Sequence, residues 1–376
     1  MVQPQPFRYL VMAALSAAVL TSACEQKRPL GTADAESADS TATADTTAAA
    51  PDTANYLSQP LVTDIYTADP SAHVFNNKIY IYPSHDIEAG TPENDNGDHF
   101  DMRDYHIFSM DSIGGKVTDH GVALDIKNIP WAKRQLWAPD AAFKNGKYYL
   151  YFPVKDKQDV FRIGVATSTS PTGPFKAEAK PIAGSYSIDP AVFTDTDGTS
   201  YMYFGGIWGG QLQRWAKGKY DSTATPEPAT GNALAPKMAK MRADMLGFEG
   251  PVKDVQILDE NGKPFQATNH DKRFFEAAWM HKYNGKYYFS YSTGDTHNIA
   301  YAIGDSPTGP FTYKGVLLNP VQGWTNHHSI VEFKGKWYLF YHDTQLSNQT
   351  HLRNIKVAEL TYQPDGTIKT ITALKK

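Results

Sequence analysis

Five side chains able to take part in chemistry occupy matching places in the sequence. Each stands eight or nine residues before a tight turn, and they are Asp69, Trp137, Asp189, Glu276 and His327. Three are carboxylic acids, and the other two supply an indole and an imidazole. Carboxyl groups held in different surroundings are what acid–base cleavage of a glycosidic bond requires. The spacing therefore predicts that these residues share one site.

The sequence around the three acids differs. Glu276 follows two phenylalanines and precedes Ala277, an apolar setting that disfavours the ionised carboxylate and predicts a raised pKa. Asp69 and Asp189 are each followed by proline, which predicts a fixed, extended entry into a strand. An Asp-Pro pair alone also fits a capped turn. Three acids at equivalent places favour a site instead.

A turn followed by an aromatic strand recurs five times and explains how such distant residues could meet. Asn-Asn, Asn-Gly, Asp-Gly or Lys-Gly supplies the turn of a hairpin in each copy, and the strands that follow begin at Lys78, Lys147, Thr199, Lys286 and Lys336. These strands are apolar on both faces, so each sheet needs a neighbour on both sides. The repeat predicts an all-β fold, a five-bladed β-propeller. A β-sandwich with similar hairpins is the alternative.

A second repeat supports this interpretation. Ser170–Phe175 reads Ser-Pro-Thr-Gly-Pro-Phe and returns unchanged at Ser306–Phe311, each time shortly after a predicted strand. We interpret it as a blade-to-blade connection. The segment from Trp208 to Arg273 is long enough to add further strands and an exposed loop around Thr223–Ala239. In a propeller the five strand starts converge on one mouth of the central channel, which places the three carboxyl groups together.

With these motifs in place, the sequence from about Leu61 onward resembles glycoside hydrolase family 43. The resemblance implies an inverting hydrolase with Asp69 as general base, Asp189 as the residue that tunes the acid and orients substrate, and Glu276 as general acid. Trp137-Ala138-Pro139-Asp140 is similar to the family's second-blade motif, which implies sugar contacts for Trp137 and Asp140. Arg353 matches an arginine near the sugar, although Asn354 departs from the acidic residue expected next to it.

The resemblance also implies a role for His327, whose fifth-blade counterpart lies on the axis beside a calcium ion or its waters. We predict that His327 helps to hold one Ca2+ in the channel; a plain hydrogen bond within the channel is the alternative. No organic cofactor is expected. The loop Glu93–Asp98 has acidic residues at the wrong places for an EF-hand calcium loop, which favours a solvated loop.

Ser84-His85-Asp86 is not a hydrolase triad, because adjacent residues on a strand point to opposite faces. A sugar-contacting role for His85 is retained as a prediction. The stretch from Tyr82 to Asp86 resembles family members described chiefly as β-xylosidases, which favours exo-β-1,4-xylosidase action on xylo-oligosaccharides. An α-L-arabinofuranosidase acting on an arabinose-decorated substrate and a non-catalytic, surface glycan-binding propeller remain alternatives.

Composition and the N-terminal sequence bear on the class of binding partner and on the cellular location. A net charge of −4 with dispersed basic residues speaks against nucleic-acid binding. Residues 1–24 read as a lipoprotein-type signal peptide: Arg8, an apolar run, and then Cys24, the only cysteine. An ordinary cleaved signal is the alternative. Residues 25–55 are rich in Ala, Thr, Ser and Asp and are predicted to be a disordered tether. We expect residues 56–376 to form the propeller of an exported bacterial lipoprotein, anchored through Cys24 on the periplasmic or cell-surface side.

Overall fold

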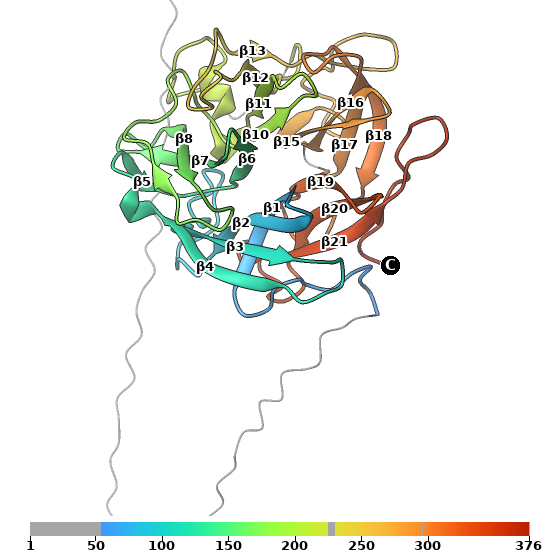
Figure 1. The fold of residues 1–376 in the computed structure, drawn as a ribbon. Coiled ribbons are helices and arrows are strands. Elements are labelled where there is room, and N and C mark those ends of the chain that lie inside the picture. The colour runs from blue at the N-terminus through green and yellow to red at the C-terminus, as the bar shows by residue number, and fades with distance from the viewer. Residues whose placement is uncertain (1–53, 225–229, 295, 376) are drawn as a thin grey trace, which may run out of the picture. The chain divides into compact units, whose positions relative to one another are not determined.

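The computed structural model describes residues 54–224, 230–294 and 296–375. The predicted signal peptide at 1–24 lies outside the described residues, as does the predicted tether except for its last two residues. The described chain is built from strands and three short 3-10 helices (Ile126–Asn128, Trp208–Gly210 and Leu212–Trp215). Five sheets surround a common centre, with strands β1, β6, β10, β15 and β19 innermost (Figure 1). The all-β, five-bladed propeller is therefore confirmed.

The blades follow one another along the chain. Blade 1 contains β1 (Tyr66–Phe75), β2 (Lys78–Asp86), β3 (Asp104–Met110) and β4 (Thr118–Asp125). Blade 2 contains β5 (Ala132–Arg134), β6 (Asp140–Lys144), β7 (Lys147–Asp156), β8 (Phe161–Ser168) and β9 (Lys176–Ala177). Blade 3 contains β10 (Ala191–Thr194), β11 (Ser200–Phe204), β12 (Lys237–Lys240) and β13 (Lys253–Asp254). Blade 4 contains β14 (Ile257–Leu258), β15 (Phe274–Tyr283), β16 (Lys286–Thr293), β17 (Ile299–Gly304) and β18 (Phe311–Leu318). Blade 5 contains β19 (His328–Phe333), β20 (Lys336–Asp343) and β21 (Asn354–Leu360).

The predicted hairpins join the first two strands of each repeat. Antiparallel ladders pair β1 with β2, β6 with β7, β10 with β11, β15 with β16 and β19 with β20. Both central turn residues have positive φ at Asn76-Asn77, Asn145-Gly146, Asn284-Gly285 and Lys334-Gly335, as two-residue hairpins of the primed type need. The Asp-Gly turn at Gly198 differs, because only its glycine has positive φ.

Apolar side chains on both faces of each sheet fill the five seams between blades. On β7, Tyr148 and Leu150 pack with Tyr82 of blade 1, whereas Tyr149 packs with Met202 of blade 3. Equivalent clusters lie between blades 3 and 4, 4 and 5, and 5 and 1. Burial of these seams supplies the main driving force for folding, and the ring leaves a cavity at its centre.

The last seam is closed by the chain that enters blade 1. Leu61 N–H donates to the Ile355 carbonyl at 2.9 Å, and Thr67 N–H donates to that of Arg353 at 2.8 Å. The segment leading into β1, together with the first residues of β1, thus lies beside β21 and completes the three-stranded fifth blade. None of the helices found in the described ranges has the length and apolar character needed to cross a bilayer.

Two expectations about connections need correction or refinement. The repeated Ser-Pro-Thr-Gly-Pro-Phe segments do not carry the chain between blades, because each joins strands of one blade (β8 to β9 and β17 to β18). They instead touch the preceding blade, through Tyr82 Oη on the Pro171 carbonyl and Tyr203 Oη on that of Pro307. The long 208–273 segment does carry extra strands, β12 to β14, and Ala239 is buried in β12 rather than in an exposed loop.

Candidate functional site

A cavity of about 270 Å³ opens at the centre of the ring. The three acids predicted from the sequence, Asp69, Asp189 and Glu276, line this cavity. The other lining residues include Trp137, His327 and Arg353. Each blade supplies a residue because the inner strands start at the same mouth. The predicted convergence of these six residues is therefore what the structure contains.

Asp69 lies among hydrogen-bond donors, the Arg353 guanidinium and two histidines. Ser84 Oγ donates to Asp69 Oδ2 at 2.7 Å, and Arg353 Nη1 donates to Oδ1 at 2.9 Å. His342 Nδ1 accepts the backbone N–H of Asp69 at 3.0 Å. Burial opposes ionisation, but the charges of Arg353, His342 and His327 and the Ser84 bond outweigh it, and they lower the pKa of Asp69 to about 2. Asp69 is therefore ionised at neutral pH.

Arg353 is itself fixed by Asp86. Its Nε and Nη2 donate to the two Asp86 oxygens at 2.8 Å each, and its backbone N–H donates at 2.9 Å. The guanidinium carbon also lies 4.8 Å from the centre of the Phe100 ring. A planar fork paired in this way is rigid. Arg353 therefore supplies a positive charge at a fixed place beside Asp69.

Glu276 and Asp189 have the opposite environment. Burial, followed by the negative charge of Asp69, raises the pKa of Glu276 to about 8. Burial and the charges of Glu276 and Asp69 raise the pKa of Asp189 well above its ordinary value. Asp189 Oδ2 accepts the N–H of Ala277 at 2.8 Å, so it fixes the backbone beside Glu276. Interacting carboxyl groups release their protons as a pair. At neutral pH the Glu276–Asp189 pair therefore still holds a proton, whereas Asp69 is ionised.

The backbone at these acids is not extended as the Asp-Pro pairs suggested. Asp69 has φ +50°, Asp189 +57° and Ala277 +61°. The ladder register also shifts between Ala68 and Ser71 and on either side of Glu276. Bulges and left-handed residues concentrate at functional sites, where they turn a side chain out of the sheet plane. The correction is that irregular backbone, not a straight strand entry, presents the carboxyl groups.

The Trp137 indole forms part of the cavity wall and is held on several sides. Its Nε1 donates to the Phe100 carbonyl at 2.6 Å, and its ring centre lies 4.7 Å from that of Phe161. A Cβ at Gly97 would lie 2.6 Å from the ring, so the positive-φ glycine permits the close approach. The 93–100 loop therefore packs directly on Trp137.

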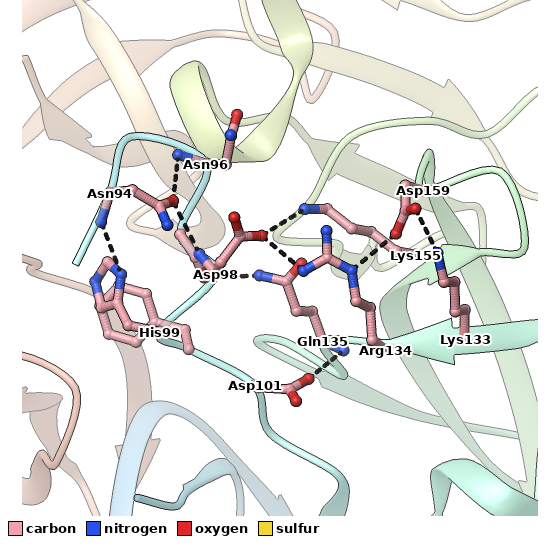
Figure 2. A network of polar contacts seen from close by, with 12 residues as sticks. Asn94, Asn96, Asp98, His99, Asp101, Lys133, Arg134, Gln135, Lys155 and Asp159 are labelled. Atoms are coloured by element: carbon pink, nitrogen blue, oxygen red, sulfur yellow. Dashed lines mark hydrogen bonds and ion pairs between the residues drawn. The ribbon is translucent and has the colours of Figure 1, made fainter. Parts of the chain in front are cut away.

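A polar network joins this loop to blade 2 (Figure 2). Arg134 Nη1 donates to Asp98 Oδ1 at 2.6 Å, and Arg134 Nε donates to Asp159 at 2.8 Å. Lys155 Nζ lies 3.8 Å from Asp98; burial and the nearby Arg134 charge lower the pKa of Lys155 to about 8. Glu93, Asn94 and Asp95 line the cavity, so the loop interpreted as merely solvated is a wall of the site.

Two predicted sugar-contacting residues lie elsewhere. Asp140 is 1% exposed and absent from the cavity wall; it accepts from Ser71 Oγ at 2.6 Å and from the backbone of Val192. It connects blades 1, 2 and 3. His85 is also absent from the wall, and its Nδ1 lies 2.6 Å from Asp104 Oδ1. His85 points away because Ser84 and Asp86, its neighbours on β2, take the face toward Asp69 and Arg353.

His327 lines the cavity beside two of the three acids. Its Nδ1 is 3.6 Å from Asp69 Oδ1 and 4.0 Å from Asp189 Oδ2. Burial lowers the pKa of His327 to about 4, so the imidazole is neutral and has a lone pair to offer. One imidazole and two carboxylates fit a divalent ion only if water completes its shell, and Arg353 already neutralises Asp69.

Several wall residues gave no recognisable signal in the sequence. Trp208 and Trp324 line the cavity with ring centres 5.9 Å apart, and Trp324 is 43% exposed. Both lie on connecting segments outside the repeat, which explains why the repeat did not reveal them. Ser84 and Asp86 did carry a signal, since residues two apart on a strand share a face.

Comparison with known proteins agrees with this geometry. The model of glycosyl hydrolases family 43 matches residues 59–368. A xylosidase/arabinosidase 43A of Humicola insolens is 60% identical over 321 residues, covering 83% of this chain and 98% of that protein. A β-xylosidase of Xylanibacter ruminicola is 54% identical over 309 residues, covering 81% and 97%.

Solved structures give the same result. A family 43 β-xylosidase/α-arabinofuranosidase from a compost metagenome, complexed with xylotriose in a calcium-free form, is 70% identical with a TM-score of 0.83, covering 85% of this chain and 98% of its own. A Xanthomonas citri family 43 enzyme complexed with xylotriose is 55% identical, with a TM-score of 0.81 and coverage of 85% and 94%. A five-bladed ring with three carboxyl groups at its mouth, matched over most of its length, places this chain in glycoside hydrolase family 43.

Proposed function

We propose that this glycoside hydrolase is an inverting exo-β-1,4-xylosidase that removes xylose from xylo-oligosaccharides. The observation that carries the proposal is the pair of opposite carboxyl environments within one cavity. Asp69 is held ionised by Arg353 and Ser84, and Glu276 is held protonated by burial. An ionised base and a protonated acid are the two groups that a single-displacement cleavage requires.

In this mechanism each proton has a stated origin. Asp69 takes a proton from a water molecule while the water oxygen forms a bond to the anomeric carbon of the bound xylose. The bond from that carbon to the glycosidic oxygen breaks, and Glu276 gives its proton to the departing oxygen. Asp189, through the Ala277 N–H, holds the backbone that orients Glu276. The configuration at the anomeric carbon inverts, because water attacks from the face opposite the leaving group.

The choice of xylose rests on relatives. Xylotriose is named in the structures of two relatives with 70% and 55% identity, and a relative with 54% identity is named a β-xylosidase. Several relatives carry both xylosidase and arabinosidase names, so α-L-arabinofuranosidase action on a decorated substrate is the second candidate. A non-catalytic glycan-binding role has no support, because the chain belongs to a hydrolase family and keeps all three acids.

Two measurements test the proposal. Hydrolysis of aryl β-xyloside and aryl α-L-arabinofuranoside under the same conditions should show a higher kcat/KM for the xyloside. Proton NMR during early turnover of xylotriose should show α-xylose as the first-formed product, released one unit at a time. β-Xylose appearing first would contradict the inverting mechanism, and faster cleavage of the arabinofuranoside would favour the second candidate.

A cation near His327 is part of the same proposal. His327 would provide one nitrogen ligand and water the remaining ligands of a Ca2+ ion, whose charge would further favour the ionised form of Asp69. The name of one relative, a calcium-free form, is consistent with such a site in that protein. Exhaustive chelation should lower activity and calcium should restore it. Unchanged activity throughout would leave His327 a hydrogen-bonding residue.

The proposal extends to the cellular location. The apolar run before Cys24 supports export as a lipoprotein facing the periplasm or cell surface. Replacement of Cys24 by Ser should release the enzyme from the membrane fraction. Retention of the variant in that fraction would contradict a lipid anchor.

A further inference from the structure

A second group of polar side chains lies in blade 1 outside the catalytic cavity. It comprises His85 at the end of β2 and Asp104 and His106 at the start of β3, and none of them lines the cavity. One donor atom from each lies within 4.8 Å of those of the other two. In the part of the chain that the structure describes, this is the one group of three such residues close enough to hold a metal ion.

The hydrogen bonds within the group assign a role to each member. His85 Nδ1 lies 2.6 Å from Asp104 Oδ1, so an ion at this point would replace the proton between them. His106 Nδ1 contacts Asp119 Oδ2 at 2.9 Å. A carboxylate on one ring nitrogen fixes a histidine and leaves its other nitrogen to bind metal. Asp119 therefore orients His106, whose Nε2 remains as the donor.

The position of the group separates it from catalysis while leaving it accessible. The side chains of His85, Asp104 and His106 are 17%, 22% and 16% exposed, so an ion could reach them from solvent. His85 points to the face of β2 opposite Ser84 and Asp86, which serve Asp69 and Arg353. The two ring centres lie 5.0 Å apart, which brings both imidazoles to one place.

We propose that His85, Asp104 and His106 form a binding site for a transition-metal ion of the zinc class, oriented by Asp119. Two imidazoles with one carboxylate suit Zn2+, Co2+ or Ni2+, whereas Ca2+ prefers a shell of oxygen atoms. Zinc ligands lie roughly 2.0–2.2 Å from the ion, so modest side-chain rotation would close the site. An ion here would join β2 to β3 and, through Asp119, to β4.

Calorimetric titration of the chelator-treated full chain with Zn2+ tests the proposal. Excess Ca2+ is present throughout, so that a calcium site near His327 is already filled. We expect one Zn2+ per chain. His106→Gln and Asp104→Asn should each weaken binding by at least about ten-fold, and Asp119→Asn by about ten-fold. His120→Gln is the matched control, because His120 belongs to the same blade but bonds to Ser109; it should bind zinc like the wild type.

A thermal melt gives a second readout that does not depend on hydrolysis. Zinc should raise the Tm of the wild type and of His120→Gln, because an ion that binds only the folded state stabilises it, and should leave that of His106→Gln unchanged. Asp119 is exposed enough for Asp119→Asn to fold if a more buried variant does not. Absence of stoichiometric zinc binding to the wild type, or equal binding by all variants, would overturn the proposal. Neither result bears on xylosidase activity.

Discussion

The two halves of the channel mouth treat a carboxyl group in opposite ways. Blades 1 and 5 surround Asp69 with a guanidinium, a hydroxyl and two imidazoles, which lower its pKa to about 2. Blades 3 and 4 bury Glu276 with Asp189 as its neighbour, and burial raises its pKa to about 8. Asp69 is buried and Glu276 is partly buried, so burial alone does not explain why their pKa values move in opposite directions. The pKa depends on whether a cation lies beside the carboxyl group, as Arg353 lies beside Asp69.

The two acids differ in pKa because they have different charged partners. Arg353 immediately precedes β21, the outer strand of blade 5, and reaches Asp69 because Asp86 holds it. Among the residues that the structure describes, no cation is paired with Glu276: Arg353 acts on it only from a distance, and the backbone N–H of Ala277 donates to Asp189. The same repeated position thus holds an ionised carboxyl group in one half of the mouth and a protonated one in the other.

Removal of either carboxyl group should have the largest effect and should separate the two halves. Asp69→Asn and Glu276→Gln should each reduce kcat on xylotriose by orders of magnitude, because one lacks the base and the other the proton donor. An aryl xyloside with a good leaving group needs little protonation, so it should partly restore turnover in Glu276→Gln and not in Asp69→Asn. Equal recovery of both variants would break the assignment of roles.

Replacement of Arg353 should move the base toward ordinary carboxyl behaviour. Arg353→Gln should lower kcat/KM by roughly 10²-fold and should shift the acid limb of the pH profile to higher pH, because Asp69 loses its nearest cation. Arg353→Lys keeps the charge and should shift the limb less while still losing activity, since the fork to Asp86 is gone. A loss of activity with no shift of the limb would mean that Arg353 acts on the sugar alone.

The unusual pKa of Glu276 should also appear in stability. A carboxyl group whose folded pKa is raised stabilises the fold fully below its unfolded pKa, and this contribution is lost as pH rises toward about 8. Glu276→Gln carries no titrating group there. Its free energy of unfolding, relative to wild type, should therefore increase by about 1–3 kcal/mol between pH 5 and pH 9. Urea denaturation of wild type and variant at both pH values measures this change. The same difference in free energy of unfolding at pH 5 and at pH 9 would contradict a raised pKa of Glu276.

The smallest effect is expected at the loop on Trp137. Asp98→Asn removes the negative charge that pairs with Arg134 and Lys155 (Figure 2). The variant should raise KM a few-fold with kcat nearly unchanged, because the loop forms a wall of the cavity but carries none of Asp69, Asp189 and Glu276. Asp254→Asn, a paired surface aspartate on β13, is the control. A large fall in kcat for Asp98→Asn would place the loop in the chemistry.

The sequence predicted what the repeat carries and missed what lies outside it. Equivalent positions before five turns identified Asp69, Asp189, Glu276, Trp137 and His327, because a propeller brings such positions together. Trp208 and Trp324 belong to connections of no fixed length, so periodicity could not locate them. Asp140 was assigned to the sugar from the motif around Trp137, yet the first residue of β6 is buried between blades.

Predictions from neighbouring residues in the sequence failed where the backbone is irregular. Proline after Asp69 and Asp189 predicted extended entries, but both aspartates have positive φ, and the ladder register also shifts at Asp69. The pKa of Glu276 was predicted correctly in direction from its apolar neighbours. The low pKa of Asp69 was not, because it depends on Arg353, which is 284 residues away in the chain and adjacent in space.

The pH dependence of kcat/KM for xylotriose tests the central claim most directly, because it reports the acid and base of the free enzyme. Opposite environments predict a broad bell, with a basic limb near pH 8 from Glu276 and an acid limb well below pH 4 from Asp69. The plateau should span neutral pH, and structural integrity at each pH can be followed by circular dichroism. A narrow bell with both limbs between about pH 4 and pH 5, where ordinary carboxyl groups titrate, would contradict it.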